Sequence, residues 1–259
     1  AYNYSMDNIT VMRDDIYYSY DTLFPSTKNI RRELNNIFEI SNENDEIWIH
    51  FSGHGYYTDD TNKDEKDKRD EVLVTINDYG RLEGILDDEL NIIFEKNISN
   101  TFIVFDCCNS GTSGDLKYTY YFKEKTPNKG IIGDELNDKP VDKYEIVKST
   151  ENKNSKVKNV HLLSGSRDDQ DSYDAFNHKT QIPMGAMTSS LLYVIRKNKH
   201  NINLHNLHKQ VCEDLINKGF SNQTPCLSIC DDKPTFTLSK INTEIKIKKP
   251  VVKMYMKLY

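Results

Sequence analysis

The chain contains the stretch Glu46-Ile47-Trp48-Ile49-His50-Phe51-Ser52-Gly53-His54-Gly55, an apolar run that ends in a histidine between two glycines. A second run, Thr101-Phe102-Ile103-Val104-Phe105-Asp106-Cys107-Cys108-Asn109-Ser110-Gly111, ends in two cysteines. Both runs have the length and the β-branched or aromatic content of buried strands. Ligands bind at the carboxyl edge of open α/β sheets. The two runs therefore predict an α/β fold that brings His54 and Cys108 to one edge of a parallel sheet.

A thiol and an imidazole at the same sheet edge suggest a catalytic dyad. A free cysteine has a pKa of about 8.5, and a nearby imidazolium increases the reactive thiolate fraction. We predict that Cys108 is the nucleophile and that His54 moves the proton. The amides of Gly55 and Cys108 are the predicted oxyanion donors, because glycine allows a close backbone approach. Bond breaking by this scheme requires no metal.

At these residues the chain resembles the metacaspases, cysteine peptidases of the caspase-like clan. The family patterns His-aromatic-Ser-Gly-His-Gly and Asp-x-Cys-His-Ser-Gly correspond to residues 50–55 and 106–111. His54 and Cys108 are 54 residues apart, close to the separation of about 50 found in caspases. Asn109 stands where the family usually has histidine. It follows the nucleophile and is not the general base, so the departure concerns substrate fit more than the dyad.

The resemblance continues beyond the dyad. Residues 162–172 (LLSGSRDDQDS) look like the family's later strand and the loop beside the substrate groove. Residues 185–190 (GAMTSS) resemble the start of its penultimate helix, and residues 223–228 (QTPCLS) its closing Gln-x-Pro-x-Leu stretch. These matches imply a caspase-like three-layer α/β sandwich, with a mostly parallel central sheet flanked by helices.

The same resemblance implies a preference for basic substrates. Asp106 lies two residues before the nucleophile, and Ser52 lies two residues before the base. In the family both positions line the pocket for the residue that precedes the cleaved bond. A carboxylate there favours arginine or lysine, because charge-assisted hydrogen bonds are about twice as strong as neutral ones. The alternative is that Asp106 only caps the following turn.

Four further carboxylates match the positions at which calcium-dependent metacaspases hold their ion. They are Asp70, Asp87, Asp88 and Asp115. Carboxylates that lie close together repel one another by about 1 kcal/mol or more per pair. Calcium offsets this repulsion, because it accepts several hard oxygen ligands in loose geometry. The resemblance therefore implies an activating Ca²⁺. Taken singly, Asp87 or Asp88 could instead cap a helix that begins at Glu89, and Asp70 could be one more charge of the loop 59–71.

Composition indicates a globular enzyme. The 259 residues are 37% hydrophobic and carry a net charge of −6, which argues against non-specific nucleic-acid binding. The sequence shows no secretory signal and no apolar span that could cross a bilayer. Five cysteines, two of them adjacent, argue against a disulfide framework and favour a reducing, cytoplasmic compartment. The expected partners are protein or peptide substrates, and the family resemblance favours a monomer.

The expected organisation is one peptidase domain over residues 1–240, followed by a basic tail over 241–259. Residues 1–122 are large-subunit-like, 123–159 form a mobile insertion with a possible self-cleavage site, and 160–240 are small-subunit-like. The sequence predicts helices over 27–38, 88–94, 186–197 and 204–218. It predicts strands over 9–12, 71–76, 160–164 and 235–238, besides the two that end at His54 and Asp106.

The beginning of the chain departs from the family. Metacaspases usually open with a strand and a helix that contribute another acidic residue to the specificity pocket. Residues 1–4 (AYNY) look like the stretch just after them, so we expect an exposed sheet edge and an incomplete pocket. Asn109 and this opening support an alternative of a different class, a non-catalytic caspase-like interaction module. Rapid alkylation of Cys108 would distinguish an enzyme from such a module.

Overall fold

The centre of the protein is a seven-stranded sheet with the strand order β14-β1-β5-β8-β12-β6-β7. The computed structural model describes residues 4–59, 69–125, 144–150, 152, 154–168, 170, 172–177, 182–234, 236–239 and 253–257, with backbone alone for 174–177, 182–183 and 253–257. The strands are β1 (Glu46–Ser52), β5 (Asn100–Asp106), β6 (Tyr118–Glu124), β7 (Tyr144–Thr150), β8 (Val160–Ser164), β12 (Cys226–Ile229) and β14 (Lys253–Lys257). The neighbours β14, β1, β5 and β8 are parallel, whereas the remaining pairs are antiparallel.

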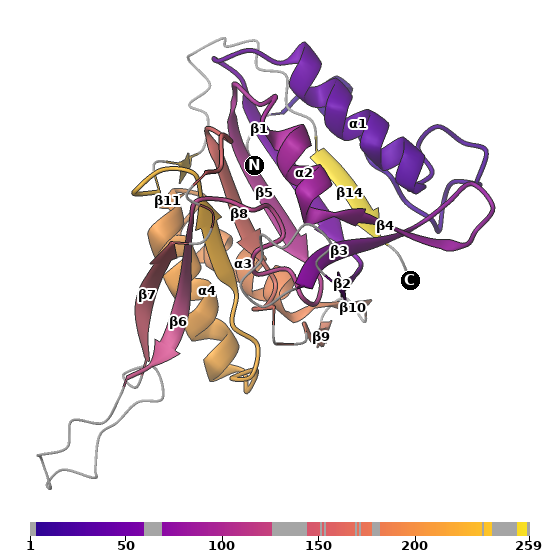
Figure 1. Ribbon diagram of the computed structural model, residues 1–259. Helices are drawn as coiled ribbons and strands as arrows, with labels where there is room; N and C mark the ends of the chain where they lie inside the picture. Colours follow the sequence, from indigo (N-terminus) through magenta and orange to yellow (C-terminus); the bar gives the residue numbers. More distant parts are fainter. Residues whose placement is uncertain are drawn as a thin grey trace, which may run out of the picture.

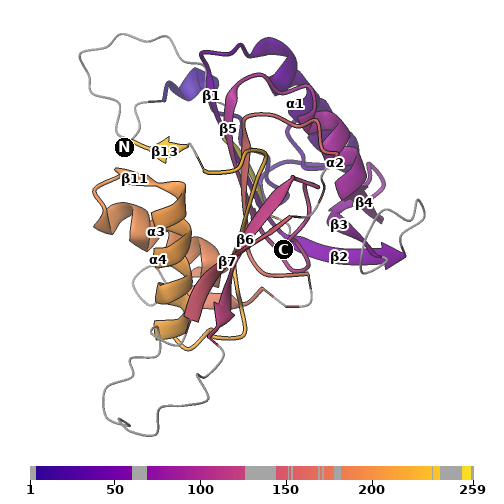
Figure 2. The same ribbon diagram turned by 60° about the vertical axis from the view of Figure 1, so that its left-hand side comes forward.

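Two pairs of helices cover the two faces of this sheet. Figure 2 shows α1 (Thr27–Ile40) and α2 (Asp87–Phe94) on one side of the sheet, and α3 (Ala186–Lys197) and α4 (Leu204–Asn217) on the other. The same layers are visible in Figure 1. The predicted three-layer sandwich with a mostly parallel sheet is confirmed, because five of the seven central strands run in the same direction.

Alternation along the strands divides the core into two clusters. Ile49 and Ile103 belong to the cluster that packs under α1 and α2, whereas Trp48, Phe102 and Val104 belong to the cluster under α3 and α4. Successive side chains of a strand point to opposite faces, so a strand with both faces covered is apolar at almost every position. This is why the two runs read as continuous apolar stretches in the sequence.

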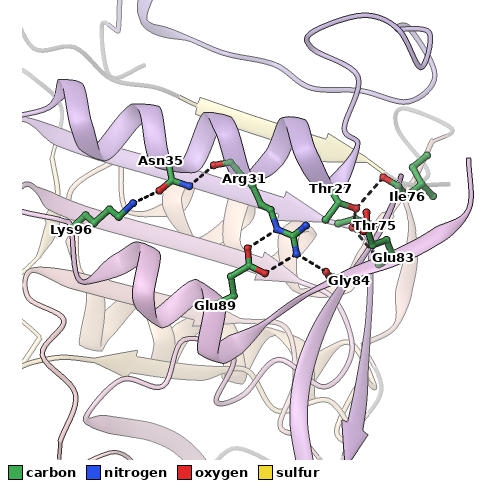
Figure 3. Close-up of polar contacts among 9 residues, drawn as sticks. All are labelled: Thr27, Arg31, Asn35, Thr75, Ile76, Glu83, Gly84, Glu89 and Lys96. Carbon is green, nitrogen blue, oxygen red and sulfur yellow. Dashed lines mark hydrogen bonds and ion pairs between the residues drawn. The ribbon is translucent and has the colours of Figure 1, made fainter. Parts of the chain in front are cut away.

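Polar side chains of helix α1 hold α2 and the residues around Thr75 and Gly84 in place. Its N-cap residue Ser26 accepts a hydrogen bond from the Asn29 amide, which satisfies one of the unpaired donors of the first turn. Arg31 donates to both carboxylate oxygens of Glu89 on α2 and to the Gly84 carbonyl (Figure 3). The Thr27 hydroxyl contacts Thr75 at 2.7 Å. The contacts of Arg31 with Glu89 hold α2 and its acidic first turn against α1.

Smaller elements surround the sheet. A three-stranded sheet follows β1 directly, and two short pairs and one 3₁₀ turn complete the described structure. Their bounds are β2 (His54–Asp59), β3 (Arg69–Ile76), β4 (Leu82–Leu86), β9 (Asp174–Asn177), β10 (Ile182–Gly185), β11 (Ile202–Asn203), β13 (Thr237–Leu238) and η1 (Met6–Asn8).

Two predictions about the first part of the chain are wrong. Residues 9–12 form no strand; Met12 is buried because it packs into the cluster under α1, which gives the segment an apolar residue without sheet pairing. The exposed edge expected beside the His54 strand is covered, because β14 pairs with β1 in parallel from Trp48 to Ser52. Helix α2 begins at Asp87 after the N-cap residue Leu86, so neither Asp87 nor Asp88 is an N-cap.

The segment 123–159 contains more structure than expected. β7 lies within it and pairs with β6, which the sequence analysis also did not predict. Residues 126–143 of the segment 123–159, for which self-cleavage is expected, lie outside the described residues, as do most of the loop 59–71 and most of the tail 241–259. None of the described helices has the length and apolar character needed to cross a lipid bilayer.

Candidate active site

Three parallel strands end at the same level of the sheet. Ser52 at the end of β1 lies opposite Asp106 at the end of β5, and Phe105 of β5 lies opposite Ser164 at the end of β8. The segments that follow these strands carry the predicted histidine, the predicted cysteine and the loop 165–173. The carboxyl edge predicted from the sequence therefore exists, and these segments form its surface.

The histidine and cysteine loops touch through their backbones. A Cβ atom placed on Gly55 would lie 1.8 Å from the Cys108 carbonyl oxygen, so only glycine permits this approach. His54, the first residue of β2, is exposed next to this contact. The fold thus brings the two predicted catalytic loops into direct contact, with the predicted oxyanion residue Gly55 at the junction.

The two adjacent cysteines have different surroundings. Cys108 is partly buried, and its Sγ atom lies 3.1 Å from the backbone nitrogen of Ser172, which donates to it. Cys107 is 1% exposed and belongs to the core under α1 and α2. Burial raises the pKa of the Cys107 thiol, and the neighbouring Asp106 adds to this effect.

The carboxylate of Asp106 is held from two sides. Its Oδ1 atom accepts a hydrogen bond from the Ser172 hydroxyl at 3.1 Å. Its Oδ2 atom accepts from the backbone nitrogen of Thr188 at 3.0 Å and from the Thr188 hydroxyl. Ser52, its partner across the strands, contacts the ring of His50 at 3.0 Å. His50 is buried.

Ser172 and Gln223 lie in the segments 162–172 and 223–228 that resemble the family, but no role was predicted for either residue. Gln223 is 2% exposed, and its side-chain nitrogen donates to the Ser172 hydroxyl and to the Gly165 carbonyl. Its side-chain oxygen accepts from the backbone nitrogen of Tyr173. The signal available in the sequence was a glutamine before a Thr-Pro pair, which does not reveal its partners.

Asn109, the departure from the family pattern, has a clear local explanation. Its φ angle is +47°, and asparagine tolerates this left-handed region better than most residues. The side-chain nitrogen donates to the Asp168 carbonyl at 2.6 Å. The Asp168 carboxylate in turn accepts from the backbone and hydroxyl of Thr112. Asn109 and Asp168 therefore join the nucleophile loop to the loop after β8.

The predicted calcium ligands lie on neighbouring elements. Asp70 on β3 and Asp87 on α2 are both 2% exposed, and Asp115 is 7% exposed. The backbone nitrogen of Glu71 donates to Asp87 at 3.0 Å, and Asn91 of α2 donates to the Asp115 carbonyl at 3.1 Å. Asp88, next to Asp87, is partly buried.

Glu71 is a buried acid between these carboxylates and the nucleophile loop. Burial raises its pKa to about 11, and the charges of Asp168 and Asp87 contribute to the shift. Its Oε2 atom accepts a hydrogen bond from the Thr112 hydroxyl at 2.9 Å. The Thr112 hydroxyl also contacts the Asp168 carboxylate at 3.1 Å, so it links Glu71 to Asp168.

The fit of these residues to calcium is partial. Carboxylate oxygens are the ligands that Ca²⁺ prefers, so the chemistry of Asp70, Asp87, Asp88 and Asp115 is suitable. Within the part of the chain that the structure describes, however, no three His, Cys, Asp or Glu residues form a group that could hold one ion. The four carboxylates would have to move closer together to share a cation.

The remaining cysteines belong to the core. Cys212, Cys226 and Cys230 are buried free thiols. Burial raises the pKa of Cys230 to about 12 and also raises that of Cys212. The spacing of Cys226 and Cys230 resembles half of a zinc site, but both side chains are buried in the core.

The layered fold, with a histidine loop against a cysteine loop at the carboxyl edge, defines a caspase-like α/β protein. The chain aligns with protein GSU0716 from Geobacter sulfurreducens at a TM-score of 0.53 and 19% identity, over 86% of this chain and 80% of that one, a likeness of fold alone. Residues 1–117 match the family described as metacaspase, peptidase C14 domain. This part of the chain is therefore similar to the metacaspase peptidase domain.

Curated relatives carry the same family name. Metacaspase-1 of Saccharomyces cerevisiae is 35% identical over 134 residues, which are 49% of this chain and 30% of the yeast protein. Metacaspase-1B of Neurospora crassa is 28% identical over 225 residues, 76% of this chain and 52% of that protein. The chain thus spans about half or less of the length of these relatives.

Proposed function

We propose that this chain is a calcium-stimulated cysteine endopeptidase that hydrolyses peptide bonds after arginine or lysine. The observation that carries the proposal is the backbone contact between Gly55 and Cys108, which places the histidine and cysteine loops side by side. The match of residues 1–117 to the metacaspase peptidase C14 domain supports the same reaction class. The proposed substrates are proteins or peptides. The proposed oligomeric state is a monomer, and the proposed location is the cytoplasm.

The proposed reaction has two stages. The Cys108 sulfur attacks the scissile carbonyl carbon, and the thiol proton passes to His54. The carbon–nitrogen bond then breaks, and His54 returns the proton to the leaving amine. Water hydrolyses the resulting thioester, with His54 accepting its proton and restoring the thiol. The amides of Gly55 and Cys108 are the proposed donors to the oxyanion of both tetrahedral intermediates.

Asp106 is the proposed determinant of basic specificity. Ser172 and Thr188 donate hydrogen bonds to its two oxygens, so the carboxylate has a fixed orientation at the edge of the sheet. A guanidinium or ammonium group that reaches it would form a charge-assisted hydrogen bond. Ser52, opposite Asp106 in the sheet, is the proposed second residue of this pocket.

Cleavage assays test the peptidase proposal directly. Fluorogenic peptides that end in Arg, Lys or Asp are incubated with the protein, with calcium and with chelator. We expect cleavage after Arg and Lys that Cys108→Ala and His54→Ala abolish. Cys107→Ala is the matched control, because the variant that lacks this buried neighbour should still cleave peptides if Cys108 is the nucleophile. Equal losses in both cysteine variants would contradict the assignment.

Calcium is proposed as an activator, bound by Asp70, Asp87, Asp88 and Asp115. The chemistry and burial of these carboxylates support the proposal, although their present arrangement requires closure around the ion. Calorimetric titration with calcium should show binding to the wild type and none to the double variant Asp87→Asn with Asp88→Asn. The control is Asp231→Asn with Asp232→Asn, an adjacent exposed pair. Equal binding by both double variants would exclude this site.

The alternative is a non-catalytic caspase-like module. Iodoacetamide alkylation followed by peptide mass spectrometry separates the two functions, because a catalytic thiol reacts far faster than an inert one. A Cys108 that reacts no faster than buried Cys212 would favour the module.

A further inference from the structure

Gln223 connects two loops at the carboxyl edge, and all of its side-chain hydrogen bonds end near the nucleophile. Its nitrogen donates to the Gly165 carbonyl and to the Ser172 hydroxyl, both at 2.9 Å. Its oxygen accepts from the backbone nitrogen of Tyr173 at 3.1 Å. The side chain is 2% exposed, so the loss of these bonds would leave buried polar groups unpaired.

Ser172 is the residue through which Gln223 reaches the site. The Ser172 backbone nitrogen donates to the Cys108 sulfur at 3.1 Å, and the Ser172 hydroxyl donates to Asp106 at 3.1 Å. One residue therefore contacts both the proposed nucleophile and the proposed specificity carboxylate.

The direction of the hydrogen bonds is determined by the chemistry of the groups. The Tyr173 amide can only donate, so it faces the oxygen of the Gln223 amide and leaves the nitrogen for Ser172. A hydroxyl has one proton to donate. Because Gln223 donates to it, the Ser172 hydroxyl is free to donate its own proton to Asp106. A carboxylate at position 223 would compete for that proton.

Gln170 provides an internal comparison. It is also a glutamine and joins the same two loops, since its side-chain oxygen accepts from the Thr224 backbone nitrogen at 2.9 Å. No described hydrogen bond connects its side chain with Ser172, Asp106 or Cys108. Replacing Gln170 thus removes a link between the loops without changing the chain of bonds that leads to Asp106.

We infer that Gln223 is a positioning residue, which sets Ser172 against Cys108 and orients Asp106 toward a basic substrate side chain. The inference rests on the proposed peptidase function for its catalytic consequence, whereas the placement of Ser172 is independent of it. The described side-chain hydrogen bonds of Gln223 end at Gly165, Ser172 and Tyr173, so Gln223 acts through Ser172.

The test compares Gln223→Met and Gln223→Glu with Gln170→Met. We expect kcat/KM for an arginine peptide, relative to its uncharged citrulline analogue, to fall about tenfold in both Gln223 variants. In Gln170→Met this ratio should stay within about twofold of the wild-type value, even if thermal stability falls. This substitution removes only a neutral hydrogen bond between the two loops. An unchanged ratio in folded Gln223→Glu would overturn the inference, since that variant preserves the shape of the side chain.

Hydrogen exchange read by mass spectrometry tests the placement without requiring activity. In Gln223→Met, the backbone amides of Ser172 and Tyr173 should exchange about tenfold faster than in the wild type, which corresponds to the loss of one buried hydrogen bond. Unchanged exchange would overturn the inference. A wild type that cleaves no peptide would refute the proposed function, and exchange would then decide the placement by itself.

Discussion

Ser52 and Asp106 lie directly opposite each other, at the ends of the parallel strands β1 and β5. Each residue precedes a proposed catalytic residue by two positions, His54 in one chain segment and Cys108 in the other. Since the strands are in register, equal offsets carry the histidine and the cysteine to the same level beyond the sheet. This one register therefore sets both the proposed pocket and the proposed dyad.

Asp106→Asn should reduce kcat/KM for arginine and lysine peptides by about 100-fold, because a neutral amide replaces a charged acceptor that is partly desolvated. The loss should be much smaller for an uncharged peptide. Ser52→Ala, on the opposite strand, removes only a neutral hydroxyl and should reduce kcat/KM about tenfold or less. Steady-state kinetics with both substrate types give these ratios, and a uniform loss for all peptides would argue against charge recognition.

Gly55→Ala should abolish most of the activity. Its new Cβ atom would meet the Cys108 carbonyl at 1.8 Å, which forces the histidine and cysteine loops apart. Misplacement by about 1 Å can cost about 100-fold in rate, so kcat should fall by at least that factor. The measurement is kcat with an arginine peptide, together with circular dichroism to confirm that the variant is folded.

Gly80→Ala is the control for Gly55→Ala. Gly80 has a φ angle of +72°, and no atom lies within 4 Å of the position that a Cβ atom would take there, so the substitution strains the backbone without a clash. It should lower the free energy of unfolding by about 1 kcal/mol and leave kcat unchanged. A similar loss of kcat in both variants would show that general destabilisation, and not the loop contact, explains Gly55→Ala.

The buried histidine of α4 should make the protein sensitive to acid. Burial lowers the pKa of His208 to about 4, and its ring nitrogen contacts the Pro225 carbonyl at 2.8 Å. Because the pKa of His208 is lower in the folded state than in the unfolded state, its burial does not reduce the free energy of unfolding above a pH of about 6.5. The free energy of unfolding decreases as the pH falls toward 4, by about 3 kcal/mol in total.

Denaturant unfolding at several pH values between about 7 and 4 measures this dependence. The His208→Gln variant should show a flatter profile, whereas His205→Gln, at an exposed position of the same helix, should keep the wild-type slope. A wild-type slope in His208→Gln would assign the acid sensitivity to other groups.

Removal of the tail from residue 241 onward should destabilise the sheet and promote self-association. β14 pairs with β1 along five positions, and its loss would expose a row of backbone donors and acceptors that other chains can pair with. Thermal unfolding and light scattering measure the two effects. The double variant Met254→Pro with Tyr255→Pro should behave in the same way, because proline cannot donate to a strand neighbour. A stable monomer in both cases would contradict the pairing.

The elements predicted best are those whose local pattern agrees with their burial. Helix α3 and strand β8 have the predicted bounds of 186–197 and 160–164, since their apolar positions match the helix or strand period. Strand β14 was missed because its placement depends on the unpaired edge of β1, a feature far away in the sequence. Residues 9–12 were predicted to form a strand, but a buried Met12 arises equally from packing against helices.

The loops of the candidate site could be predicted, but the bonds between them could not. The glycines on either side of His54 mark a close approach, and the structure shows that approach at Gly55. The partners of Gln223 lie 50 residues or more away in the chain, and nothing in a local pattern encodes such distances. The carboxylates of the proposed calcium site were identified as a set, whereas their separation depends on how β3, α2 and the 112–116 turn pack.

The position of β14 has a consequence for biosynthesis. Among the described strands of the central sheet, β1 is synthesised first, and its partner β14 ends at residue 257. Synthesis adds about 5–20 residues per second, so roughly 200 residues must follow β1 before its outer edge can be covered. The nascent chain therefore spends about 10 seconds or more with that edge open, the interval in which a chaperone would protect it.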